Sequence, residues 1–249
     1  MSTAPTGSVD ETTHGGLVAA TWNALSLFAF LGLCTLILLG VAYFGNGPMR
    51  AIGLSEDRTP IQIVIGNDVF AIPENMIRHG TQRSPGVTNS VDLVVHWPSA
   101  EGYSSERLAE FSSTDPSSID TVLVGLTQRH SLLDMRSRFQ PALKRALLGG
   151  SVTQLSSGLY EAKLDPQYGF IDETLVYSRA QVAGGDPQFV ARCYGSTAQK
   201  KLLHPCELDS FIGVSGAARV RFSRTHLYDW RTFQVWLESA LDGLLTKTD

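Results

Sequence analysis

The residue types best suited to chemistry in this sequence are six histidines, three cysteines and a group of arginines near the C-terminus. No two histidines stand at the three- or four-residue spacing that places metal ligands on one helical face. The HExxH, GxSxG, Walker, GxGxxG and CxxC patterns are also missing. We therefore predict that the chain uses no metal and no cofactor, and that it is not an enzyme.

A hydrolytic site of an unfamiliar kind is the enzymatic alternative. It would require His96, His204 and Asp209 to converge in one cavity, since members of a catalytic triad meet through the fold. A triad of Ser210 with its neighbours His204 and Asp209 is a weaker form of the same idea. The segment 213–216, with the sequence GVSG, resembles a nucleophile elbow but lacks its second glycine, so a turn between strands is expected there.

Four arginines form the candidate partner-binding strip: Arg219, Arg221, Arg224 and Arg231. In the sequence RVRF of residues 219–222, basic and apolar residues alternate, so in a strand the two arginines project together while the apolar residues face the core. Such a strip suits an anionic lipid head group, a glycan carboxylate or an acidic protein surface. The alternative is a solvated strand face paired with scattered carboxylates.

Cys193 and Cys206 are separated by twelve residues and are the only cysteines outside the apolar N-terminal stretch. A disulfide between them would close a loop and would persist only in an oxidising compartment. Two free thiols, or a metal site with His204 and His226, remain the alternatives. With the disulfide favoured, we expect the main domain to lie in the periplasm of a bacterium.

The elements that must position these residues follow from hydrophobic periodicity and turn residues. Residues 61–65 and 69–72 flank the sequence GND and predict a β-hairpin. Two helices are predicted at 131–148 and 227–245, because their apolar residues recur at spacings of three and four, and a shorter helix is predicted at 105–111. The further predicted strands are 91–97, 121–126, 159–164, 173–179, 188–194, 206–212 and 217–223.

Residues 24–44 form an apolar run of 21 residues without a charge. At about 1.5 Å per residue a helix of this length spans roughly 31 Å, the thickness of a bilayer core. A cleaved signal peptide is the alternative, but no Lys or Arg precedes the run and no Ala-x-Ala precedes the turn that follows it. The residues expected to anchor the helix are Trp22, Phe28, Phe30, Leu36, Leu39 and Tyr43.

These observations predict an α+β protein with one N-terminal transmembrane helix and a single mixed α+β extracytoplasmic domain. The expected parts are a disordered tail at 1–16, the helix at 17–45, a linker at 46–59 and the domain at 60–249. The chain has 20 Lys and Arg against 24 Asp and Glu, a net charge of −4, which argues against nucleic acid as a partner. A hydrophobic fraction of 43% excludes wholesale disorder.

The sequence RVRFSRTHLYDWRTFQVWLESALDGLL at residues 219–245, the single apolar span and the cysteine pair together resemble uncharacterised, membrane-anchored envelope proteins of bacteria. The resemblance implies the same layout of an anchor and an envelope domain, and no known activity. We expect the anchor to lie in the bacterial cytoplasmic (inner) membrane and the main domain in the periplasm. We expect a single-pass accessory or scaffold subunit that binds an integral membrane protein complex, with the lipid bilayer as its other partner. The alternatives are the membrane-tethered hydrolase and an envelope immunity or inhibitor protein that blocks a toxin.

Overall fold

The computed structural model describes residues 30–37, 39, 53–195 and 202–246. The chain divides into two compact units, Met1–Met49 and Arg50–Asp249. In the first unit, residues 30–37 and 39 are helical, and the side chains of Phe30, Leu36 and Leu39 are exposed.

The other expected anchor residues, Trp22, Phe28 and Tyr43, lie outside the described residues, as do the predicted tail at 1–16 and residues 46–52 of the predicted linker. Among the helices that are described, none combines the length and the hydropathy needed to cross a bilayer. The predicted transmembrane helix therefore stays a prediction.

The second unit is an α+β fold built on a large antiparallel sheet, as the sequence predicts. Its strands lie in the order β4-β5-β11-β10-β9-β8-β7-β6, and a smaller sheet has the order β2-β1-β3. The strands are β1 (Pro60–Ile65), β2 (Asp68–Pro73), β3 (Gly86–Val87), β4 (Ser90–His96), β5 (Thr121–Gln128), β6 (Thr153–Gln154), β7 (Tyr160–Lys163), β8 (Glu173–Tyr177), β9 (Val190–Tyr194), β10 (Cys206–Ile212) and β11 (Gly216–Phe222).

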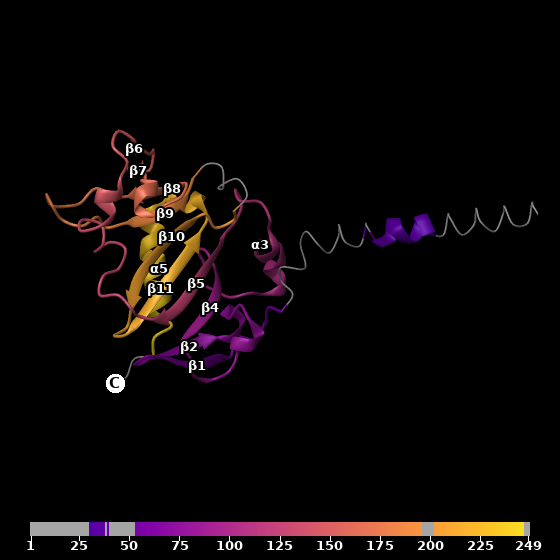
Figure 1. The fold of residues 1–249 in the computed structure, drawn as a ribbon. Helices are drawn as coiled ribbons and strands as arrows, with labels where there is room; N and C mark the ends of the chain where they lie inside the picture. The colour runs from indigo at the N-terminus through magenta and orange to yellow at the C-terminus, as the bar shows by residue number, and fades with distance from the viewer. Residues whose placement is uncertain (1–29, 38, 40–52, 196–201, 247–249) are drawn as a thin grey trace, which may run out of the picture. The chain divides into compact units, whose positions relative to one another are not determined.

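Among the described residues of this unit, two α-helices accompany the sheets, α3 (Leu108–Ser112) and α5 (Trp230–Asp242). The short 3-10 helices in the described part of the chain are η1 (Glu74–Met76), η2 (Gly80–Gln82), η3 (Ser105–Arg107), η4 (Leu143–Ala146), η5 (Pro166–Tyr168) and η6 (Arg224–Leu227). Figure 1 shows α5 against one face of the large sheet, behind β10 and β11. Phe233 on this helix is fully buried and packs on Phe222 of β11, with ring centroids 4.8 Å apart.

The predicted hairpin is β1 and β2, joined by a two-residue turn in which Gly66 has a φ of 63°. A side chain at this glycine would collide with Ser215 Oγ, which also accepts a hydrogen bond of 2.7 Å from the Asn67 N–H. The Asp68 carboxylate accepts the backbone N–H groups of Val214 and Ser215 at 2.8 and 2.7 Å. The GVSG segment is therefore a turn that docks the small sheet onto the large one.

The helix predicted at 131–148 is wrong over most of its length. Residues 135–142 form irregular turns, and only η4 is regular. Pro141 has no N–H to continue a helical ladder, and the Asp134 carboxylate accepts the Ser137 N–H at 2.8 Å as in a capped turn. The apolar face is nevertheless real, because Met135, Phe139 and others in this segment are buried in the main core.

Candidate functional site: an arginine-lined face of the large sheet

The face of the large sheet opposite α5 carries the predicted arginine pair. On β11 the alternate residues Ala218, Val220 and Phe222 are buried, so Arg219 and Arg221 project from the opposite side and are exposed. On β10 Glu207 pairs in register with Arg221, and Asp209 pairs with Arg219. The two strands thus place acidic and basic side chains opposite each other.

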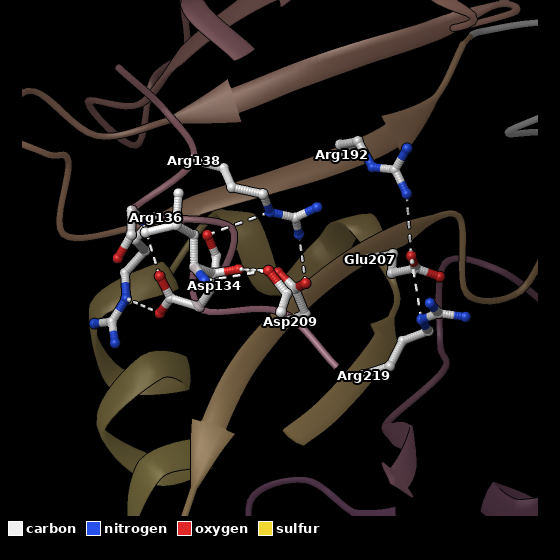
Figure 2. A network of polar contacts seen from close by, with 10 residues as sticks. Asp134, Arg136, Arg138, Arg192, Glu207, Asp209 and Arg219 are labelled. Atoms are coloured by element: carbon white, nitrogen blue, oxygen red, sulfur yellow. Dashed lines mark hydrogen bonds and ion pairs between the residues drawn. The ribbon is translucent and has the colours of Figure 1, made fainter. Parts of the chain in front are cut away.

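Glu207 is the centre of this cluster. Its carboxylate lies 3.0 Å from Arg221 Nε, 3.7 Å from Arg219 Nε and 3.2 Å from Arg192 Nη2 on β9. Arg192 has a second carboxylate partner, Glu173, at 3.3 Å. The side chains of Arg219 and Arg221 are 65% and 53% exposed. Both contact the Glu207 carboxylate, which also contacts Arg192, so one carboxylate faces three guanidinium groups. Figure 2 shows Glu207 between Arg192 and Arg219.

A second carboxylate, Asp209, forms an ion pair with Arg138 from the segment that follows β5. Arg138 is held in turn by the backbone oxygen of Asp134, which accepts from its Nε at 3.3 Å. Burial raises the pKa of the Asp134 carboxyl, but the Ser137 N–H and the Arg136 guanidinium outweigh that effect and leave its pKa below the usual value. Asp134 therefore stays ionised and fixes the turn that carries Arg138.

Arg138, Asp209, Arg219 and Arg221 line a groove of about 640 Å³ on the open face of β4, β5, β10 and β11. Its charged lining residues are Arg78, Arg129, Arg138, Arg219, Arg221, Asp92 and Asp209. Arg129 lies over the ring of Phe211 at 4.7 Å and donates to the Val214 carbonyl at 2.9 Å, which fixes its position at the rim. The exposed Arg78 guanidinium has no polar partner within the described part of the chain. The groove is thus locally positive on a chain of net negative charge.

The structure separates the four arginines that the sequence grouped together. Arg219 and Arg221 line the groove, whereas Arg224 pairs with Glu161 of β7 at 2.5 Å and Arg231 lies over the ring of Trp230 at 4.4 Å. Neither Arg224 nor Arg231 lines the groove.

Three groove arginines were missed at the sequence level: Arg78, Arg129 and Arg138. They come from connecting segments rather than from the strand with the alternating pattern. No signal in the sequence relates those segments to β11.

The histidines and the aspartate of the predicted hydrolytic site have different partners. Asp209 pairs with Arg138, and His204 Nε2 lies 2.8 Å from the Thr121 carbonyl. His96 instead approaches Glu110, with 2.8 Å between Nε2 and Oε2. Among the described residues, no group of three or more His, Cys, Asp and Glu side chains is arranged to hold a metal ion.

The predicted disulfide is confirmed. Cys193 of β9 and Cys206 of β10 are directly paired in register, both are buried, and their sulfurs are bonded at 2.05 Å. These cysteines are therefore neither free thiols nor metal ligands. Disulfides persist in oxidising compartments, which agrees with an expected location outside the cytoplasm.

Removing the disulfide should destabilise the domain by about 3 kcal/mol, because a loop with a sequence separation of 13 then gains its full freedom in the unfolded chain. The measurement is urea unfolding of the Cys193→Ser/Cys206→Ser chain, and of the unchanged chain with and without a reductant. Cys34→Ser is the matched control, since Cys34 is not part of the disulfide. Equal unfolding midpoints for the double variant and the Cys34 control would contradict the prediction.

Neither a protein-family model nor a curated protein sequence matches the chain. Among solved structures, the chain is similar to "Smlt3025, an immunity protein of the Stenotrophomonas maltophilia type IV secretion system", with a TM-score of 0.49 and 13% sequence identity. The match covers 76% of this chain and 94% of that chain. A likeness of this degree assigns neither a family nor a function to the chain.

Proposed function

We propose that residues 50–249 form a binding domain that receives an acidic segment of a protein partner in the arginine-lined groove. The observation that carries the proposal is the sharing of Glu207 by three guanidinium groups, two of which are more than half exposed. A guanidinium can donate two parallel hydrogen bonds to one carboxylate. A partner carboxylate placed over Arg219 and Arg221 would use donor capacity that Glu207 alone leaves unfilled.

The chemistry of the groove favours carboxylates over a less directional anion. Its lining cations are arginines, and none of the lysines in the described part of the chain lines it. Arginine is the side chain suited to planar, bidentate recognition, whereas lysine acts as a point charge. A basic groove on a chain of charge −4 also steers an acidic surface toward this one face rather than to the whole molecule.

The shape of the site favours a protein segment over a lipid head group. The arginines line a groove on the sheet face, together with residues of the connecting segments such as His130 and Leu133. A flat bilayer surface contacts protruding cations, whereas an extended chain or a loop can enter a groove between walls. The groove therefore supports an acidic loop or strand as the occupant.

The same proposal places the domain on a single-pass accessory or scaffold subunit of a membrane or envelope complex. Two features support that setting: the disulfide, which persists outside the cytoplasm, and the apolar run at 24–44, which is long enough for an anchor. An inhibitor that covers an acidic surface of a toxin would use the same kind of face. The identity of the captured partner, an integral membrane protein or a toxin, separates these two roles.

Site-specific photo-crosslinking tests the proposal. A photoreactive amino acid replaces Ala217 in the groove or, as the control, Val235 on the exposed face of α5. We expect one protein adduct from position 217 and none from position 235. The Arg219→Glu/Arg221→Glu chain should lose this adduct and bind the identified partner about 100-fold or more weakly, because each reversal opposes a partner carboxylate.

The matched control is Arg145→Glu/Arg179→Glu, which makes the same change in net charge at two exposed arginines outside the groove. This control should keep the adduct and the affinity. Equal losses in both double variants, or adducts with lipid alone from position 217, would contradict the proposal.

A further inference from the structure

The loop that follows β4 brings a hydroxyl, an imidazole and a carboxylate into one chain of contacts. Ser99 Oγ lies 2.9 Å from His96 Nδ1, and His96 Nε2 lies 2.8 Å from Glu110 Oε2 on α3. The imidazole is buried, with 8% of its side chain exposed, while Ser99 is exposed to solvent. A candidate nucleophile, a base and a residue that can orient the base are therefore in contact one after another, and the nucleophile lies at the surface.

The two contacts of His96 assign its tautomer. The nitrogen that faces a carboxylate carries the proton, so we assign the proton to Nε2, and Nδ1 is the acceptor, shared between the Ser99 hydroxyl and the Arg107 guanidinium. Glu110 Oε2 is buried and its approach to Nε2 is close but does not have the geometry of a straight hydrogen bond. The Glu110 side chain is 43% exposed and has room to rotate into alignment, as catalytic contacts do when a substrate binds.

Arg107 supplies a positive charge at the reacting oxygen. Its Nη1 donates to Ser99 Oγ at 3.0 Å and also contacts His96 Nδ1, and its Nη2 pairs with Glu101 at 3.3 Å. A guanidinium in this position can receive the negative charge that develops on a carbonyl oxygen when its carbon is attacked by Ser99. The arrangement thus contains a group for each charge that an acyl transfer creates.

We propose that Ser99 is a catalytic nucleophile toward carboxylic esters, with His96 as its general base, Glu110 as the positioning residue and Arg107 as the group that stabilises the oxyanion. In the first step the Ser99 Oγ–carbonyl carbon bond forms, the hydroxyl proton passes to His96 Nδ1, and the alcohol leaves with that proton. In the second step water, deprotonated by His96, attacks the acyl-serine, releases the carboxylic acid and returns the proton to Ser99. The site is separate from the arginine-lined groove, so this proposal stands independently of the binding function.

The state of His96 suits a base. Burial lowers the pKa of His96 and Arg107 acts in the same direction, while Glu110, Asp120 and Glu101 act to raise it. The result is a pKa below the ordinary value, so the imidazole is neutral at pH 7. The rate of the reaction should therefore fall only when the pH drops below about 6.5, the unperturbed value for histidine.

The test uses the full-length chain with an alkyl fluorophosphonate. An activated serine attacks the phosphorus of this probe and displaces its fluoride, which leaves the serine covalently labelled. Peptide mass analysis should place the adduct on Ser99, and p-nitrophenyl acetate should acylate the same residue. Ser99→Ala should lose the adduct, and Glu110→Gln should slow its formation about tenfold or more while the chain stays folded. Ser105→Ala, an exposed serine of the same connection, is the matched control and should label at the unchanged rate.

Two results would overturn the proposal. One is the absence of a Ser99 adduct in the folded chain with both probes. The other is an adduct whose rate is the same in the Glu110→Gln chain and does not depend on pH between 5 and 8, which would describe an ordinary exposed hydroxyl.

Discussion

Replacing Phe233 by alanine should lower the free energy of unfolding by about 4 kcal/mol. Phe233 is fully buried where α5 meets the large sheet, and its ring lies 4.8 Å from that of Phe222, 4.9 Å from His226 and 5.5 Å from Trp97. Truncation loses the favourable free energy of transferring the ring from water to the core. It also leaves a cavity, because the sheet and α5 keep the surrounding rings from closing the space. Urea unfolding of the full-length chain in mild detergent, followed by tryptophan fluorescence, gives the difference directly.

The matched control is Val235→Ala on the same helix. Val235 is 68% exposed, so its truncation should change the free energy of unfolding by less than about 0.5 kcal/mol. A loss below about 1.5 kcal/mol for Phe233→Ala, or equal losses for the two variants, would mean that α5 does not hold the sheet as described.

The last helix was predictable because its apolar residues recur at helical spacing, and Trp230, Phe233, Leu237 and Leu241 are indeed its buried face. The same spacing predicted a helix at 131–148 that does not form. The difference lies in backbone groups rather than in the apolar pattern: Pro141 interrupts the ladder, and Asp134 offers a local acceptor. In both segments the periodicity correctly identified which side chains are buried. It correctly predicted a helical backbone only in the last helix.

The order of the strands in the large sheet could not be predicted from the sequence. Alternation shows which face of β11 is buried, but it does not show that β11 lies between β5 and β10. That order is set by pairing between strands that are far apart in the sequence, a non-local property. It also decides the site, because the groove exists only where β4, β5, β11 and β10 are neighbours.

The two candidate sites differ in how much of each could be predicted from the sequence. Arg219 and Arg221 could be identified from the alternation of one strand, although their acidic partner Glu207 could be assigned only with the register. The hydrolytic site predicted from the sequence grouped His96 with His204 and Asp209. In the fold, His96 instead contacts Ser99, Arg107 and Glu110, which follow it within fifteen residues. The turn after β4 and the start of α3 fold these neighbours back onto the imidazole, and the sequence contains no motif for that turn.

A buried histidine makes the stability of the domain depend on pH. His226 lies against the rings of Trp97, Phe222 and Phe233, and its Nε2 is buried without a hydrogen-bond partner among the described residues. Burial lowers the pKa of His226 to about 4, and the charge of His204 acts in the same direction. The folded state therefore holds this imidazole in its neutral form.

The sign of the effect follows from which state binds the proton. Between pH 6.5 and about 4 the unfolded chain binds a proton at His226 that the folded chain does not, so the free energy of unfolding falls as the pH is lowered. The difference between the two pKa values corresponds to a loss of about 3 kcal/mol, most of it reached at pH 4 and absent above pH 7. Lowered carboxyl pKa values, such as that of Asp68, act mainly below this range.

His226→Phe isolates the contribution, since a phenyl ring fits among aromatic neighbours and cannot be protonated. We expect this variant to lose about 3 kcal/mol less stability than the unchanged chain between pH 7 and pH 4, as measured by urea unfolding at a series of pH values. The remaining acid sensitivity of the variant reports the other groups, of which His96 is one with a lowered pKa. Parallel stability curves for the two chains over this range would show that His226 is solvated or hydrogen-bonded in the folded state, contrary to the packing described above.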